Sequence, residues 1–185
     1  MVSQESYRKK KSLKLSIIEG SFYSVSEGMG LRNISPYALA MGASNSFIAL
    51  LSSLPSLAGS FFQLFSYKIS KRRTKKEIIS KAVFLQSFFW ILMIIPGLLF
   101  LKYESLTNFY FFLLLIIYTV LIILGAIISP IWNAWMKDLI DERELGSYFS
   151  RRNRICSIIS FISLLIGGFV LDKFKEINYA IYGFF

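Results

Sequence analysis

Long uncharged stretches alternate with short charged segments along this chain. Four stretches contain no Asp, Glu, Lys or Arg, and they run for 35, 20, 32 and 17 residues over 33–67, 82–101, 105–136 and 155–171. About 20 apolar residues are enough for a helix to cross a bilayer, whereas a soluble domain would spread its charge over its surface. The pattern therefore predicts an all-α fold, a polytopic bundle of transmembrane helices.

Five membrane spans are expected from this pattern and its flanking charges. They lie at about 15–40, 45–67, 79–101, 107–135 and 155–171. A further apolar run at 177–185 is too short to cross a bilayer, so we expect it to be a partial sixth span. No polar linker or soluble segment interrupts the pattern. Residues 1–185 are therefore expected to form a single membrane domain that stops before a sixth helix is complete.

Basic residues give the expected orientation. The chain has 21 Lys and Arg against 11 Asp and Glu, and most of the basic residues fall within 8–14, 68–81 and 137–154. These segments flank alternate spans, and basic loops stay on the cytoplasmic side. We therefore expect an integral protein of the cell membrane with a cytoplasmic N-terminus. This distribution accounts for the net charge of +10 without a nucleic-acid partner.

The residue inventory argues against catalysis and against metal binding. The chain has no His and a single Cys, Cys156, so neither a Cys/His metal site nor a Ser/His or Cys/His catalytic pair can be built from it. It also has no Gly-x-Ser-x-Gly elbow and no phosphate-binding loop. We expect no enzyme, no metal site and no cofactor.

The first span is unusual because it carries charged residues. Glu19 and Glu27 lie on one helical strip, and a neighbouring strip at spacing four contains Ser16, Gly20, Ser24, Gly28 and Arg32. A charge at mid-bilayer costs about 2.5–3.5 kcal/mol on insertion scales, so it must face protein or water. One interpretation is that this helix lines a polar cavity, where Glu19, Glu27 and Arg32 bind a solute or couple protons. The alternative is that Glu19 and Arg32 reach the two membrane interfaces.

Two other spans carry polar faces. In the second span they are Ser52, Ser56, Gly59, Ser60 and Gln63. Small residues at this spacing favour helix packing. The fourth span places Asn133 beside Trp132 near its end. Gln63 and Asn133 complete the set of candidate solute-binding or proton-coupling residues.

Motifs around the fourth and fifth spans resemble a known family. Residues 132–139 read Trp-Asn-Ala-Trp-Met-Lys-Asp-Leu, Arg143 follows, and 146–153 read Gly-Ser-Tyr-Phe-Ser-Arg-Arg-Asn. This resembles the connection between helices 4 and 5 in a group of major facilitator superfamily transporters, where Trp-x-x-Trp-x-x-Asp precedes Arg-Gly-x-Tyr-Phe-x-x-Arg-Asn. Similarity also extends to Glu19-Gly20, 38–45, 50–55 and Gln63, and so covers nearly the whole chain.

The loop between the second and third spans departs from the family pattern. In place of Gly-x-x-x-Asp-Arg-x-Gly-Arg-Lys it has Ser66, Ser70 and Arg73 at the first Gly, the Asp and the second Gly. The acid of the family's cytoplasmic lock is thus missing, and Asp138 with Arg151 and Arg152 is a candidate replacement. The resemblance implies that the gating residues are Asp138, Arg143, Arg151, Arg152 and Asn153.

The resemblance implies transport by two six-helix bundles that rock about a central site. Helices 1, 2, 4 and 5 of this half would line the cavity. The leading hypothesis is a secondary-active transporter that moves a small solute by alternating access, present here as an N-terminal portion. Its partners would be the lipid bilayer, the solute, and the missing C-terminal half or a second chain. The alternative is a truncated, non-transporting membrane protein that acts only as an interaction partner or remnant. An ion channel would need a filter loop, and the outer loops are too short to form one.

Overall fold

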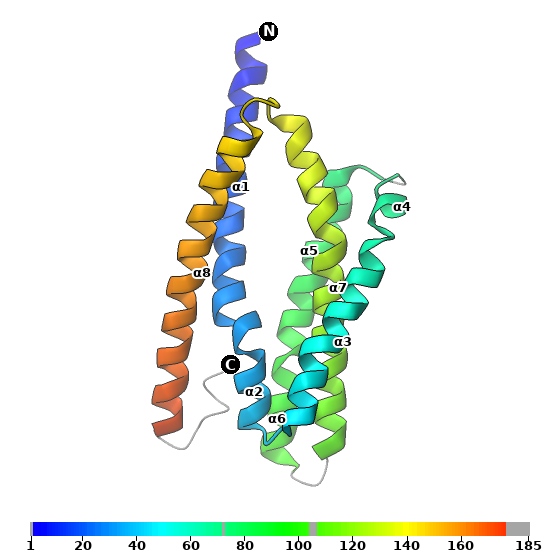
Figure 1. The fold of residues 1–185 in the computed structure, drawn as a ribbon, viewed down its shortest axis with the longest axis vertical. Helices are drawn as coiled ribbons and strands as arrows, with labels where there is room; N and C mark the ends of the chain where they lie inside the picture. Colours follow the sequence, from blue (N-terminus) through cyan, green and yellow to red (C-terminus); the bar gives the residue numbers. More distant parts are fainter. Residues whose placement is uncertain (1, 72, 104–106, 177–185) are drawn as a thin grey trace. The chain divides into compact units, whose positions relative to one another are not determined.

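The computed structural model describes residues 2–71, 73–103 and 107–176, and every regular element within them is a helix (Figure 1). This confirms the all-α prediction. The expected partial sixth span, 177–185, lies outside the described residues. The elements in chain order are α1 (Val2–Met29), η1 (Leu31–Asn33), α2 (Ile34–Ala40), α3 (Asn45–Gln63), α4 (Ser66–Ser70), α5 (Lys75–Leu92), α6 (Ile94–Lys102), α7 (Thr107–Leu139) and α8 (Leu145–Glu176).

Four helical segments among the described residues are long and apolar enough to cross a membrane. They are Asn45–Gln63, Lys75–Lys102, Asn108–Leu139 and Leu145–Lys175. Each overlaps one of the last four expected spans. The expected first span, 15–40, contains the end of α1, the η1 turn and α2. It carries the charged residues noted above, and the total number of spans stays a prediction.

The chain divides into two compact units. Among the described residues, the first unit contains α1, η1, α8 and the adjoining ends of α2 and α7. The second contains α3 to α6 and most of α7. The division falls within α2, after Pro36, and within α7, after Trp135.

In the first unit, α1 and α8 lie side by side along much of their length (Figure 1). Glycines allow this approach. A Cβ atom at Gly28 would clash with the carbonyl oxygen of Ser160, and one at Gly20 would clash with the guanidinium of Arg152. Ser16 and Ser24, which share this strip of α1, are buried. The small residues therefore bring the two helices close together.

The end of α1 is stabilised by a side chain from the turn that follows it. Asn33 Nδ2 lies 2.8 Å from the carbonyl oxygen of Met29 and 3.2 Å from that of Gly28, and it donates hydrogen bonds to both. These carbonyls have no partner in the helix once α1 ends. The contact fixes the η1 turn and therefore the position of Arg32 within it.

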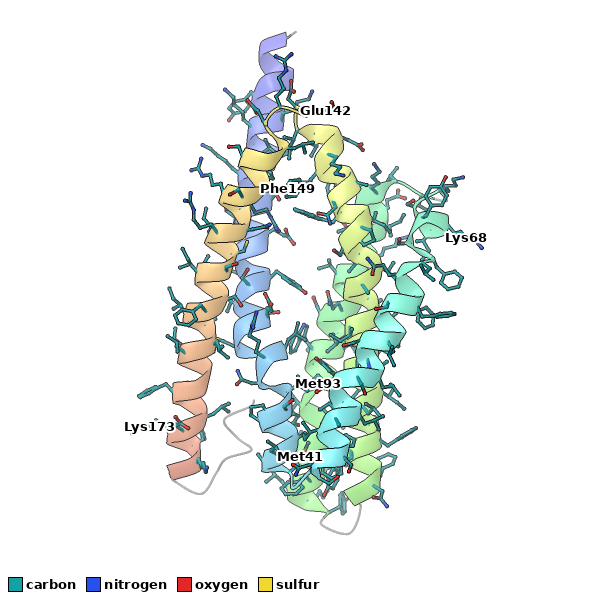
Figure 2. The ribbon with its side chains drawn as sticks, viewed as in Figure 1. Met41, Lys68, Met93, Glu142, Phe149 and Lys173 are labelled. Atoms are coloured by element: carbon teal, nitrogen blue, oxygen red, sulfur yellow. The ribbon has the colours of Figure 1, made fainter. Side chains whose placement is uncertain are left out.

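The second unit packs α3, α5, α6 and α7 around buried apolar side chains. Met41 and Met93 are among them (Figure 2). Tyr37 donates a hydrogen bond of 3.1 Å to the carbonyl oxygen of Met93, at the break between α5 and α6. Gln86 on α5 donates one of 3.3 Å to the carbonyl oxygen of Leu121 on α7. These bonds satisfy polar groups that water cannot reach within a bilayer.

Large apolar side chains cover the outer faces of both units. Leu57, Phe84, Phe112 and Phe169 are all exposed. A soluble protein rarely exposes apolar surface on this scale, whereas lipid solvates it without cost. The exposed surface thus fits the bilayer predicted from the sequence.

Candidate functional site

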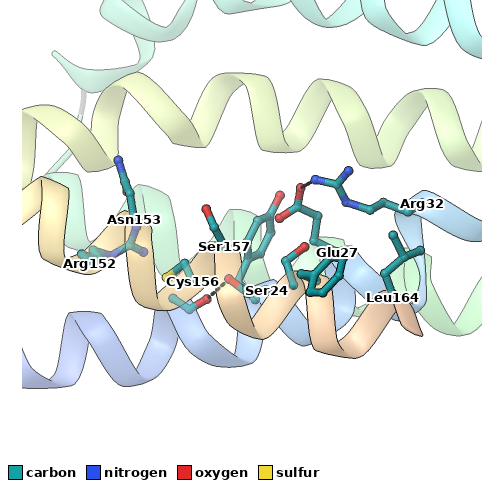
Figure 3. Close-up of a pocket in the computed structure, with 12 residues that line it drawn as sticks. Ser24, Glu27, Arg32, Arg152, Asn153, Cys156, Ser157 and Leu164 are labelled. Carbon is teal, nitrogen blue, oxygen red and sulfur yellow. Dashed lines mark hydrogen bonds and ion pairs between the residues drawn. The ribbon is translucent and has the colours of Figure 1, made fainter. Parts of the chain in front are cut away.

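A pocket of about 480 Å³ lies within the first unit, between α1 and α8 (Figure 3). It sits on the helix pair whose glycines permit close approach. Its lining from the α1 side is Gly20, Tyr23, Ser24, Glu27 and Arg32, and from α8 it is Arg152, Asn153, Cys156, Ser157, Ser160, Phe161 and Leu164. Charged and hydroxyl groups from both helices therefore gather around one pocket.

An ion pair closes one end of the pocket. Arg32 Nη2 lies 3.1 Å from Glu27 Oε1 (Figure 3), and the side chains of Arg32 and Glu27 are 52% and 35% exposed. The η1 turn, held by Asn33, brings Arg32 back toward the last turn of α1. The more deeply placed partner at this end is the carboxylate.

A second ion pair connects α8 with α1 at the other end. Arg152 Nη2 lies 3.5 Å from Glu19 Oε2, and the side chain of Arg152 is 15% exposed whereas that of Glu19 is 57% exposed. Arg152 Nε also donates a hydrogen bond of 3.3 Å to the carbonyl oxygen of Ser16. Gly20 leaves room for the guanidinium. At this end the more deeply placed partner is the cation.

Hydroxyl groups lie between the two charged ends. Ser24 Oγ donates a hydrogen bond of 2.7 Å to the carbonyl oxygen of Gly20. Ser160 is 5% exposed, and its Oγ has no hydrogen-bond partner in the described part of the chain. Buried polar atoms are almost always hydrogen-bonded, so an exception at a pocket calls for an explanation.

The structure brings together four of the ten site residues predicted from the sequence. Glu27, Arg32, Arg152 and Asn153 all line the pocket, and Glu19 is joined to it through Arg152. Arg152 was assigned to the gate, but here it forms an ion pair with an acid that was assigned to the solute site.

The other five predicted residues lie outside this pocket. Gln63, the last residue of α3, and Asn133 on α7 belong to the second unit, and both are exposed. Asp138, Arg143 and Arg151 are exposed positions at and beside the connection between α7 and α8.

The contribution of α8 to the pocket was not predicted from the sequence. Arg152, Cys156, Ser160 and Leu164 follow one another at spacing four and share one face of this helix. The predicted fifth span begins at 155, whereas α8 already begins at Leu145, so Arg152 was placed in a loop. The spacing of four was the available signal for a polar helical face.

Metal binding has no obvious site in the described segments. Within residues 2–71, 73–103 and 107–176, no group of three or more His, Cys, Asp or Glu side chains could hold a metal ion. The pocket offers guanidinium, carboxylate and hydroxyl groups for polar recognition of a solute instead.

Apolar helices of membrane length, with charged groups gathered in a pocket between α1 and α8, define an integral membrane protein with a polar site between two of its helices. The chain matches the family model of the Major Facilitator Superfamily over residues 21–185, and it therefore belongs to this family of membrane transporters. The resemblance drawn from the motifs around the fourth and fifth spans is thus confirmed. Searches among curated proteins and among solved structures gave no significant match.

Proposed function

We propose that this protein is a secondary-active transporter that moves a small solute by alternating access, and that the α1–α8 pocket forms part of the solute path. The observation that carries this proposal is the pair of ion pairs, Glu27–Arg32 and Glu19–Arg152, at the wall of one pocket. Charged side chains within membrane helices are costly and usually mark solute or ion pathways. Membership of the superfamily supports the same function.

Ion pairs of this kind suit a binding site that alternates between an empty and a solute-loaded state. A solute that binds one partner releases the other, so the pocket gains contacts that exist only in the loaded protein. We assign Glu19, Glu27 and Arg32 to solute binding or proton coupling, as proposed from the sequence, and add Arg152 to this group. Gln63 and Asn133 remain proposed contributors from the second unit.

The remaining assignments concern gating and orientation. Asp138, Arg143, Arg151 and Asn153 are proposed to make gating contacts on the cytoplasmic side, around the start of α8, where Arg152 would also act. The N-terminus would be cytoplasmic and the protein would reside in the cell membrane. A second, pseudo-symmetric half, in the same polypeptide or in a second chain, would complete the solute path.

The test is solute uptake by the full-length native polypeptide in proteoliposomes. Candidate solutes are screened with and without an imposed proton gradient, and then each active solute is tested with Glu27→Gln. We expect the variant to lower proton-driven uptake by about tenfold or more, equivalent to about 1.4 kcal/mol of lost coupling, while solute exchange at equal pH continues.

A matched variant controls for the loss of one negative charge. Glu142→Gln changes an exposed residue in the α7–α8 connection, outside the pocket, and should leave uptake unchanged. Undiminished proton-driven uptake by Glu27→Gln would refute the coupling role. Failure to transport any solute would refute the proposed function itself.

A further inference from the structure

The less exposed partner of the ion pair is a cation at one end of the pocket and a carboxylate at the other. Arg152 is the buried partner at one end, with a side chain 15% exposed against 57% for Glu19. At the other end Glu27 is the deeper partner, with 35% against 52% for Arg32. We propose that the pocket binds a zwitterionic solute about 10 Å long, whose carboxylate contacts Arg152 and whose ammonium group contacts Glu27. This inference rests on the proposed function and specifies its solute class.

The length follows from the spacing of residues along α1. The Arg152 guanidinium lies at the level of Gly20, where it would meet an added Cβ atom. Gly20 and Glu27 are seven residues apart, and a rise of 1.5 Å per residue separates them by about 10 Å along the helix. Three extended peptide units span about 10 Å, so a solute of this length reaches both ends.

The ion pair between Arg152 and Glu19 allows the Glu19 carboxylate to be exchanged for a solute carboxylate. Its separation of 3.5 Å is long for a charge-assisted hydrogen bond, and the Glu19 carboxylate is more than half exposed. A solute carboxylate that enters the pocket can therefore replace Glu19, and a planar guanidinium can bind it through two parallel hydrogen bonds. Arg152 keeps its position meanwhile, because its Nε is bonded to the carbonyl oxygen of Ser16.

The buried Ser160 adds a hydroxyl group to the lining of the pocket. It is 95% buried in a residue that lines the pocket, and its Oγ has no partner among the described residues. The Ser160 backbone lies against Gly28, next to Glu27, so this hydroxyl is at the end that would receive the ammonium group. An ammonium carries three donors, and a hydroxyl oxygen can accept one of them.

The charges of the pocket also balance. Two arginines and two carboxylates form it, counting Glu19 through its contact with Arg152. A pocket for a simple anion or cation would carry an excess of the opposite charge. Balanced, separated charges favour a solute that is itself neutral overall and charged at both ends.

Cys156 provides a readout that does not depend on transport. It lines the pocket one helical turn after Arg152, and it is the single cysteine of this sequence. The full-length protein in membranes is treated with a small neutral methanethiosulfonate reagent, and the rate of modification at Cys156 is followed by peptide mass spectrometry. Triglycine, N-acetyltriglycine and triglycinamide, which share the triglycine backbone, are added in turn as competitors.

Triglycine, which has both charges, should protect Cys156. N-acetyltriglycine lacks the cation and triglycinamide lacks the carboxylate, and each should bind about tenfold more weakly because it loses one charge-assisted contact. Arg152→Gln should make triglycine and triglycinamide protect Cys156 equally well. Glu27→Gln should make triglycine and N-acetyltriglycine protect Cys156 equally well. Arg154→Gln removes the same charge as Arg152→Gln from an exposed position outside the pocket and should keep triglycine more protective than either analogue.

Equal protection by all three peptides, protection by none, or full protection by N-acetyltriglycine would overturn the inference. Because Arg152 also contacts the backbone of α1, loss of packing could mimic loss of binding in Arg152→Gln. Glu27→Gln changes the opposite end of the pocket and tests the inference independently of that contact. Uptake of another solute without protection by triglycine would refute the zwitterion assignment alone. Protection by triglycine without uptake of any solute would refute transport alone.

Discussion

The close contact between α1 and α8 leads to a quantitative prediction at Gly28. A Cβ atom there would clash with the carbonyl oxygen of Ser160 and would lie 2.8 Å from Ser163 Cβ and 3.0 Å from the Leu164 amide nitrogen. Two of these three atoms belong to the α8 backbone and cannot move aside as a side chain can. Gly28→Ala therefore requires the two helices to separate.

The expected change in stability combines two opposing effects. Overpacking a well-packed interface costs about 1–3 kcal/mol, and contact with backbone atoms places this site toward the upper end. Alanine is favoured over glycine inside a helix by about 1 kcal/mol. We expect Gly28→Ala to lower the free energy of unfolding by about 1–2 kcal/mol.

Gly168 on α8 is the matched control. It also lies inside a helix, but an added Cβ atom would meet nothing within 4 Å, so Gly168→Ala should raise the free energy of unfolding by about 0.5–1 kcal/mol. Thermal unfolding of the purified full-length protein in detergent, followed by circular dichroism, measures both variants. A Gly28→Ala protein as stable as Gly168→Ala would refute the packing described for α1 and α8. Adding Ser163→Gly should not restore stability, since the carbonyl oxygen of Ser160 would remain in place.

Three further predictions concern the second unit, the topology and the native chain. Tyr37→Phe removes a buried hydrogen bond to Met93 and should lower the free energy of unfolding by about 1 kcal/mol, whereas Tyr7→Phe, at an exposed position, should not change it. In a Cys156→Ser background, Ser70→Cys should react with an impermeant thiol reagent only from the cytoplasmic side and Asp172→Cys only from the outside; the reverse pattern would contradict the predicted orientation. An antibody against the basic segment 8–14 should detect, in source membranes, a polypeptide about twice the 21.3 kDa of this sequence, because the proposed transport path includes a second half. A species of 21.3 kDa that pairs with no other chain would favour the remnant hypothesis over transport.

The fold was predictable to the extent that charge and hydrophobicity decide it. The uncharged stretches indicated where α3, α5 with α6, α7 and most of α8 lie, because lipid excludes charge from these segments. The break at Met93 within the third expected span was not predicted. Pro96 has no N–H to donate to the carbonyl oxygen of Leu92, and this weakens the helix where α5 ends.

Only part of the candidate site could be predicted from the sequence. Glu19, Glu27 and Arg32 stand out because charge is rare within a span. The partner of Glu19 could not be read from the sequence, because which helix meets this acid is decided by tertiary packing. The position of Arg152 against Glu19 depends on α8 beginning at Leu145 and on the space left by Gly20, and neither follows from local composition.

The tight seam between α1 and α8 also bears on how a transport cycle would work. Helices that contact each other through backbone atoms at Gly28 and through Arg152 cannot slide or tilt independently without breaking these contacts. In the proposed cycle such a pair would move as one rigid body, and domain rotations of this kind leave the internal geometry of each body unchanged. The pocket would then present the same wall to a solute arriving from either side of the membrane. Any difference in affinity between the inward-facing and outward-facing states would have to arise from the helices that move against this wall.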